Sequence, residues 1–157
     1  MTNYEFEMQE LLDEIKATPM PNPEELVAKA PNDNIKNALP IAEQIYLALK
    51  VIIKKYNLKG FTLRCFDLLT AVKNTGCLAL AKFNSEGVIA TCEGDVPAML
   101  SMAITNSLAS VSGFQANPAH INPTSGEMLF AHCTIPFNMI ERYEFDTHFE
   151  SGIGVGI

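Results

Sequence analysis

Two carboxylates, Glu93 and Asp95, follow a short apolar segment and directly precede a helical pattern. Residues 88–91 are apolar and β-branched, which is typical of a buried strand. Asp95 stands where a helix N-cap is expected, because Pro97 suits a first helical turn and residues 98–108 have helical spacing. Glu93 is left at the carboxyl end of the strand, where open α/β sheets collect ligands. The pair could move protons or hold a cation; alternatively, Asp95 only caps the helix and Glu93 only ends the strand in solvent.

A third carboxylate, Asp67, follows another segment with strand character. Residues 61–66 are rich in aromatic and β-branched side chains, and residues 75–83 have a helical pattern. Strand, helix, strand and helix then alternate, which predicts a parallel sheet. Asp67 and Glu93 are expected at equivalent ends of its two strands.

The pattern changes after this alternation. Residues 114–117 and 127–133, joined by a turn at 123–126, predict two antiparallel strands, and residues 142–150 predict a third. The glycine-containing tail, residues 152–157, has no helix after it, so it is no dinucleotide loop and is expected to form one more strand.

Two histidines fall in these predicted strands. Alternation along the third strand places His148 on its polar face or in a wet cleft. His132 shares a face with Met128 and Phe130, where an imidazole can be a ligand or a core residue whose ring nitrogens are hydrogen-bonded.

Three helices are expected before the sheet. Apolar residues recur at helical spacing in each, and each has local signals for its start. The expected helices are one capped by Thr2 or Asn3 and ending before Pro19, one over residues 23–30 with a capping box from Asn22 to Glu25, and one with an apolar stripe from Ile35 to Ile53. We therefore predict an α/β fold, in which a parallel βαβα sheet segment (residues 1–110) precedes an antiparallel β segment (residues 111–157).

Composition excludes several classes of protein. The chain has 157 residues, a net charge of −7 and no basic cluster, which argues against a nucleic-acid surface. No signal peptide and no apolar run of roughly 18 residues is present, so a cytoplasmic protein that does not bind membranes is expected. The four cysteines form no C-x-x-C pair and are interpreted as buried thiols in a reducing compartment.

Six motifs, taken in order, resemble those of the L-fucose isomerase/L-arabinose isomerase superfamily, nearest its fucose-isomerase-like branch. They are CFDLL (65–69), TGCLAL (75–80), CEGDVPA (92–98), FQANP (114–118), FAHC (130–133) and THFESG (147–152). The resemblance runs from about residue 34 to the end. It implies a partial chain that covers the end of the family's α/β middle domain and the start of its antiparallel C-terminal domain.

The resemblance also implies an activity. Family members interconvert aldoses and ketoses with a divalent metal, commonly Mn²⁺, and Mg²⁺ suits the same oxygen-rich ligands. An enediol path needs one group to remove a proton from carbon and another to return it, while a chelated cation stabilises the negative charge. A sugar substrate and a homo-oligomer, a trimer or hexamer in the parent protein, are implied as well.

Site roles carry over by matching motif positions. Glu93 matches the glutamate that binds the metal and acts as acid or base, and His132 and His148 match metal-ligand histidines. Asn117 falls at or beside the place of the second carboxylate. This is a departure from the family, because an amide can coordinate a metal through its oxygen but cannot act as a base. Asp95 is then a second catalytic candidate, and Asp67 and Asn117 are candidates for substrate binding.

Three hypotheses follow from these residues. The first is a metal-dependent aldose–ketose isomerase-like protein, in which this chain alone is inactive because the rest of the site is missing. The second is a sugar-binding or regulatory relative with a degenerate metal site, and the third is a structural module whose site is completed by a neighbouring subunit. If a metal site exists, we expect the side-chain tips of Glu93, His132 and His148 to lie within about 10 Å of one another.

Overall fold

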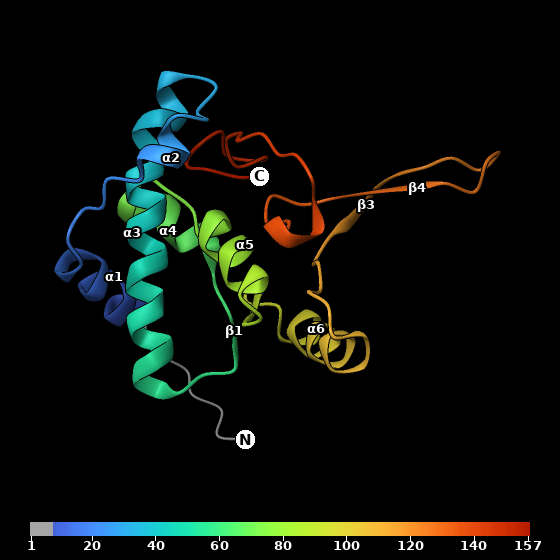
Figure 1. Ribbon diagram of the computed structural model, residues 1–157, viewed down its shortest axis with the longest axis horizontal. Coiled ribbons are helices and arrows are strands. Elements are labelled where there is room, and N and C mark those ends of the chain that lie inside the picture. Colours follow the sequence, from blue (N-terminus) through green and yellow to red (C-terminus); the bar gives the residue numbers. More distant parts are fainter. Residues whose placement is uncertain (1–7) are drawn as a thin grey trace.

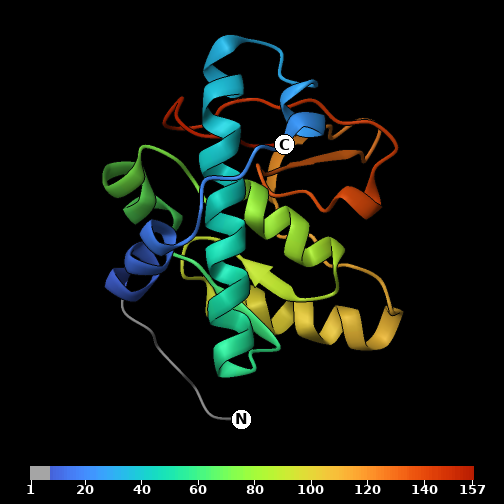
Figure 2. The same cartoon turned by 60° about the vertical axis from the view of Figure 1, so that its left-hand side comes forward.

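The computed structural model describes residues 8–157, and the long helix α3 (Asp33–Tyr56) is its central element. Helices α1 (Met8–Ala17) and α2 (Glu24–Val27) both pack on α3. Asn32 caps α3 by accepting a hydrogen bond from the Ile35 amide at 3.0 Å. In Figure 2, α1 and α5 lie on either side of this helix.

A two-stranded parallel sheet lies beside α3. Strand β1 (Gly60–Thr62) pairs with β2 (Ile89–Thr91), with Phe61 opposite Ala90. Helices α4 (Cys65–Val72) and α5 (Cys77–Ser85) connect the strands, and α6 (Val96–Ala109) follows β2. Both α5 and α6 pack against β2, and Figure 2 shows the strand between them. The predicted βαβα order with a parallel sheet is confirmed.

The first predicted strand is much shorter than expected. Pairing stops at Thr62, and α4 begins at Cys65, inside the segment predicted to be extended. Asp67 therefore lies in the first turn of α4 and does not follow a strand end as Glu93 does. A carboxylate in a first helical turn interacts favourably with the helix dipole, which gives Asp67 a local structural role.

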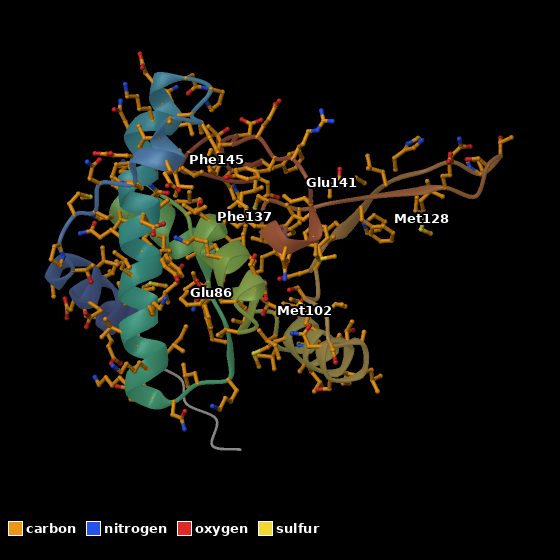
Figure 3. All side chains as sticks on the ribbon, viewed as in Figure 1. Glu86, Met102, Met128, Phe137, Glu141 and Phe145 are labelled. Carbon is orange, nitrogen blue, oxygen red and sulfur yellow. The ribbon has the colours of Figure 1, made fainter. Side chains whose placement is uncertain are left out.

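The antiparallel segment is a hairpin that extends away from the helices (Figure 1). Strand β3 (Asn117–Ile121) pairs with β4 (Met128–Ala131), with a shift in register between Pro118 and His120. The predicted pair of strands is confirmed, but its first strand begins where residues 114–117 were expected to end. Every residue of both strands is exposed, and Figure 3 shows Met128 out on the hairpin, whereas Phe145 lies against the helical body.

The predicted third strand does not form. The 3₁₀ turn η1 (Phe137–Met139) is followed by irregular chain, whose one described β-bridge joins Asp146 to Gly156. The tail is likewise no strand but folds back onto this segment. Phe145 is buried against the helices and Tyr143 packs beside it, whereas Phe149 is 92% exposed, so these aromatic residues do not share one buried face as a strand would require.

Two groups of buried side chains form the core. The first joins α1, α3, α5 and the sheet through residues such as Leu11, Leu49, Phe61 and Phe83. The second contains Ile35, Leu39 and Ala42 of α3, Leu78 of α5, and Phe145 and Val155 of the C-terminal segment. Burial of these apolar side chains fixes the C-terminal segment over the start of α5. The division of the chain at residue 110 stays a prediction.

Neither helix cap that the sequence predicted before α3 is found in residues 8–157. The proposed cap at Thr2 or Asn3 lies outside the described residues. The predicted capping box from Asn22 to Glu25 is wrong, because α2 has no side-chain cap. The Asn22 side chain instead donates from Nδ2 to Glu24 Oε1 at 2.9 Å. None of the helices in residues 8–157 is long and apolar enough to cross a membrane.

Candidate functional site

Glu93 follows β2 at a sharply turned point of the backbone. Its φ angle is 66°, and the next residue, Gly94, has a φ of 70°. A left-handed conformation is unfavourable for a residue with a side chain, so the surrounding contacts must hold it. The Gly94 amide donates to the Leu63 carbonyl at 3.2 Å, and the Asp95 amide donates to the Cys92 carbonyl at 3.1 Å. The turn presents the Glu93 carboxylate at the edge of the sheet, with its side chain 46% exposed.

Asp95 is the N-cap of α6, as predicted. Its Oδ1 accepts a hydrogen bond from the Ala98 amide at 2.8 Å, and a proline follows in the first turn. The cap determines where α6 starts and therefore limits how far the turn at Glu93 can move.

A second set of hydrogen bonds holds β2, the strand that leads to Glu93, in place. The Asn84 side chain donates to the Ala90 carbonyl at 2.7 Å and accepts from the Ala90 amide at 2.9 Å. The Cys92 amide donates to Gln115 Oε1 at 2.7 Å. Asn84 is buried, so these bonds pair backbone groups that water cannot reach. Asn84 thus holds the middle of β2 and Gln115 holds the residue before Glu93, so both help to position the turn.

His132 lies beside Glu93. Its Nε2 is 3.8 Å from Glu93 Oε1, and its Nδ1 hydrogen-bonds the Thr134 hydroxyl at 2.9 Å. The imidazole is largely buried, with 8% of its side chain exposed. A long contact with the Cys133 sulfur and the nearby Glu93 carboxylate together raise the pKa of His132 above its ordinary value, against the opposing effect of burial. At 3.8 Å the carboxylate and the imidazole are too far apart for a direct hydrogen bond, but they are close enough to share a cation between them.

His148 is buried, which corrects the expectation that it faces solvent or a wet cleft. Only 6% of the residue is exposed. Its Nδ1 hydrogen-bonds the Ser151 hydroxyl at 3.1 Å, and its ring meets Phe66 edge-on. The predicted alternation fails here because residues 142–150 are not a strand, so neighbouring side chains need not face opposite ways.

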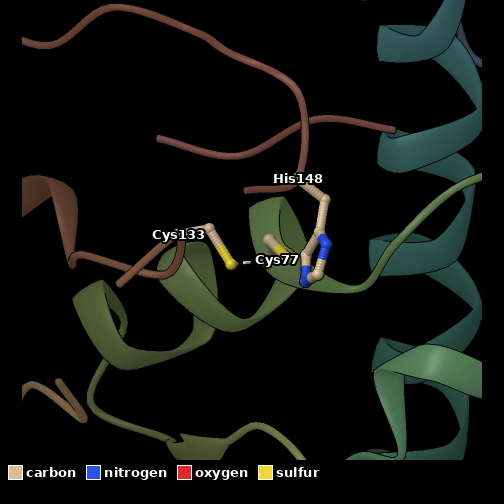
Figure 4. A group of neighbouring side chains, drawn as sticks. All are labelled: Cys77, Cys133 and His148. Carbon is tan, nitrogen blue, oxygen red and sulfur yellow. Dashed lines mark hydrogen bonds between the residues drawn. The ribbon is translucent and has the colours of Figure 1, made fainter. Parts of the chain in front are cut away.

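Two cysteine sulfurs lie close to His148. One of its ring nitrogens and the Sγ atoms of Cys77 and Cys133 all lie within 4.8 Å of one another (Figure 4). The two sulfurs are 3.2 Å apart, and this contact, together with burial, raises the pKa of Cys133 far above its ordinary value. Cys133 also lies 3.9 Å from His132 Nδ1, so it is next to both histidines.

The other two cysteines form a separate buried pair. The Cys92 thiol donates to Cys65 Sγ at 2.7 Å, and all four cysteines are free thiols. That contact and burial raise the pKa of Cys65 well above its ordinary value. The predicted burial of the thiols is confirmed for three cysteines, and Cys133 is partly buried. Neither pairing could be predicted, because the partners are distant in sequence and no short motif joins them.

Asn117 and Asp67, the two candidates for substrate binding, have no hydrogen bond or ion pair with Glu93 in residues 8–157. Asn117 is exposed on β3 opposite Ala131, and within residues 8–157 no hydrogen bond joins its side chain to Glu93, His132 or His148. Asp67 pairs with Arg64 at 3.3 Å between Oδ2 and Nε. Their predicted roles in substrate binding, and that of Asn117 as a ligand, stay predictions.

Two hollows of about 600 and 320 Å³ lie elsewhere on the surface of residues 8–157. Lys29 and residues 141–144 line the larger, whereas Lys73 and residues 152–154 are among those lining the smaller. Glu93, His132 and His148 line neither of these hollows, and 46% of the Glu93 side chain is exposed.

Distant relatives support a connection with sugar isomerases. Over 92 residues, the chain is 28% identical to a protein named sulfoquinovose isomerase from Alkalicoccus urumqiensis, covering 57% of this chain and 21% of that protein. A protein of the same name from Priestia aryabhattai is 26% identical over 87 residues, covering 54% of this chain and 20% of that protein. No family model and no solved structure matches the chain. The chain spans about a fifth of the length of the curated relatives it matches.

Proposed function

We propose that this chain supplies the acid/base carboxylate of an aldose–ketose isomerase, with Glu93 as that group. The observation that carries the proposal is the Glu93–His132 pair, 3.8 Å apart, at the carboxyl end of a parallel strand. The distant similarity to proteins named sulfoquinovose isomerase supports the reaction class. The substrate is accordingly an aldose, and a sulfonated aldose is the first to test.

The donor atoms at this pair fit a hard divalent cation such as Mn²⁺ or Mg²⁺. Glu93 offers carboxylate oxygens and His132 offers an imidazole nitrogen, which such ions accept. Two ligands do not complete a site, so the remaining ones come from elsewhere. Bound there, the cation would stabilise negative charge on the sugar oxygens.

Glu93 performs the proton transfer in this proposal. Its carboxylate takes the proton from C2 of the aldose to give an enediol and returns that proton to C1, while the proton of the C2 hydroxyl passes to the oxygen on C1. His132 holds the carboxylate in position from 3.8 Å away. Asp95 positions Glu93 through the helix cap, since its Oδ1 already accepts the Ala98 amide.

The rest of the site lies outside this chain in our proposal. Neither of the two hollows described above includes Glu93, and the matched segment covers only 21% of the Alkalicoccus urumqiensis relative. The hairpin also exposes Leu129 and Phe130, which are 59% and 53% accessible. Such an apolar surface is typical of an interface, which favours a homo-oligomer in which a neighbouring subunit covers the site.

In our proposal this chain is part of a longer polypeptide, the parent, and the test uses that parent. The protein is incubated with Mn²⁺ and a panel of aldoses, including sulfoquinovose, and ketose formation is followed by NMR. We expect conversion of at least one aldose, and no conversion by the 157-residue chain alone. Failure of the parent to convert any aldose, with or without Mn²⁺, would contradict the isomerase function.

A sugar-binding relative without catalysis is the second candidate, and Asn117 favours it. An asparagine cannot supply the second carboxylate charge that the resemblance implies. In the parent, Asn117→Asp should strengthen Mn²⁺ binding about tenfold if residue 117 faces the metal. Calorimetry on both versions measures this, and stronger binding without conversion of any aldose would favour the binding protein.

A further inference from the structure

We propose that Cys77, Cys133 and His148 form a binding site for a thiophilic divalent cation, namely Zn²⁺, separate from the Glu93–His132 pair. One donor atom of each residue lies within 4.8 Å of the other two. Around a tetrahedral zinc ion with Zn–S bonds of about 2.3 Å, neighbouring sulfurs are about 3.8 Å apart. The observed sulfur separation of 3.2 Å needs only a small opening of the cluster.

The donor types select this metal over Mn²⁺. Thiolates are soft ligands that favour zinc, whereas manganese and magnesium favour oxygen. Two cysteines and one histidine make up the protein ligands of one known type of zinc site, in which water takes the fourth position. His148 thus belongs with sulfur ligands, which differs from the oxygen-rich role implied by the resemblance.

Burial favours binding of the ion with both thiols deprotonated. Cys77 is fully buried and His148 is 6% exposed, so a single charge among them would be costly. On binding, each thiol S–H bond breaks, its proton leaves to solvent, and two Zn–S bonds form. The complex of Zn²⁺ with two thiolates and a neutral imidazole carries no net charge, so it suits an interior.

Neighbouring groups prepare His148 for this role. When its Nδ1 donates to the Ser151 hydroxyl at 3.1 Å, Nε2 carries the free lone pair that a metal needs. The nearby His132 is otherwise engaged, with its Nδ1 on Thr134 and its Nε2 facing Glu93. Three ligands therefore come from three segments: the first turn of α5, the chain after β4, and the C-terminal segment (Figure 4).

The close approach of the C-terminal segment depends on glycine. A Cβ on Gly156 would lie 3.0 Å from the Cβ of Cys133, so a side chain there would push the two segments apart. The Ile157 amide also donates to the Cys133 carbonyl, at 3.4 Å. By coordinating Cys133, His148 and Cys77, a bound ion would tie the chain after β4 and the C-terminal segment to α5, and it should raise the melting temperature.

The test titrates Co²⁺ and then Zn²⁺ into the purified, reduced 157-residue chain. The thiolate-to-cobalt charge-transfer absorption should saturate at one Co²⁺ per chain, and added Zn²⁺ should abolish it by displacing the cobalt. Mn²⁺ should neither bind at these residues nor raise the melting temperature. Cys77→Ala and His148→Ala should each lower Zn²⁺ affinity at least tenfold. The matched control is Cys65→Ala with Cys92→Ala, which removes the other buried thiol pair and should leave Zn²⁺ affinity unchanged.

A second measurement needs no substitution and so does not depend on the variants folding. Wild-type chain is alkylated with iodoacetamide with and without Zn²⁺, and each cysteine is quantified by mass spectrometry. Protection of Cys77 and Cys133 without a change at Cys65 and Cys92 supports the site. Equal labelling with and without Zn²⁺, or equal loss of the cobalt band in the control variant, would overturn it.

Discussion

Glu93 Oε1 lies 3.8 Å from His132 Nε2, although one residue follows the parallel sheet and the other follows the antiparallel hairpin. The contact joins the two parts of the fold at a backbone turn where Glu93 adopts a left-handed conformation. Such conformations are held only where other contacts support them, and they gather at functional sites. The predictions below test the contact, its supports and its chemistry.

His132 should stabilise the fold most in acid. Because its pKa is raised in the folded chain, its contribution is fully present below the unfolded pKa, about 6.5, and is lost as pH rises through the folded value. His132→Gln should therefore lower the free energy of unfolding more at pH 5.5 than at pH 8.5, as measured by urea denaturation. His120→Gln, on the exposed face of β3, is the control. A loss that is equal at both pH values would contradict a raised pKa.

Asn84→Ala should destabilise the chain by about 2–4 kcal/mol, because two buried backbone groups of Ala90 lose their partner. The matched control is Asn106→Ala, which removes a buried amide oxygen that has no partner within the described chain. That substitution should cost less than about 0.5 kcal/mol or stabilise α6. Chemical denaturation measures both, and similar losses would show that the Asn84 bonds contribute little.

Gly154→Ala should lower stability by about 2 kcal/mol or more, since two effects combine. Gly154 has a φ of 73°, and an added Cβ would lie 2.8 Å from the Thr75 amide nitrogen. Gly152 has a similar φ of 63° but open space around it, so Gly152→Ala should cost only about 1 kcal/mol. Thermal melts of the two variants separate the effects of crowding and backbone strain. Equal melting temperatures would mean that the C-terminal segment is not packed against α5 as described.

Asp95→Asn distinguishes the two roles considered for Asp95. Asparagine caps helices as well as aspartate does, so stability should change by less than about 0.5 kcal/mol. If Asp95 acts only through the cap, isomerase activity of the parent should fall by less than about threefold, well below the loss from removing an acid/base group. A loss of about a hundredfold would instead make the Asp95 carboxylate a catalytic group.

Local signals in the sequence predicted the elements around Glu93 well. The β-branched segment before Glu93, the Asp95 cap and the helix after it follow from spacing and capping preference, and all three are present. The extended segment over residues 61–66 was too long, because strand propensity alone cannot show where the chain turns into α4. The aromatic alternation around Phe145 likewise looked like a strand, yet its burial is met by packing on α3.

The zinc site that we propose could not be predicted from local sequence patterns. Cys77, Cys133 and His148 come from three separate segments, and only tertiary packing brings them together. Their spacing matches no short metal-binding motif, and periodicity placed His148 on a polar face because it assumed a strand. The contact between Glu93 and His132, by contrast, was expected from the resemblance, which already contains long-range information.

Exchange of the C2 hydrogen with solvent tests the central claim, that Glu93 is the acid/base group of an isomerase, most directly. The parent protein and its Glu93→Gln variant are incubated in D₂O with Mn²⁺ and an aldose that the parent converts, and deuterium in recovered sugar and product is followed by NMR. Glutamine keeps the shape and an oxygen ligand but cannot take a proton. The account predicts exchange and conversion by the parent and a loss of about a hundredfold or more of both in the variant, with an unchanged melting temperature. Exchange by Glu93→Gln at the parent's rate would contradict it.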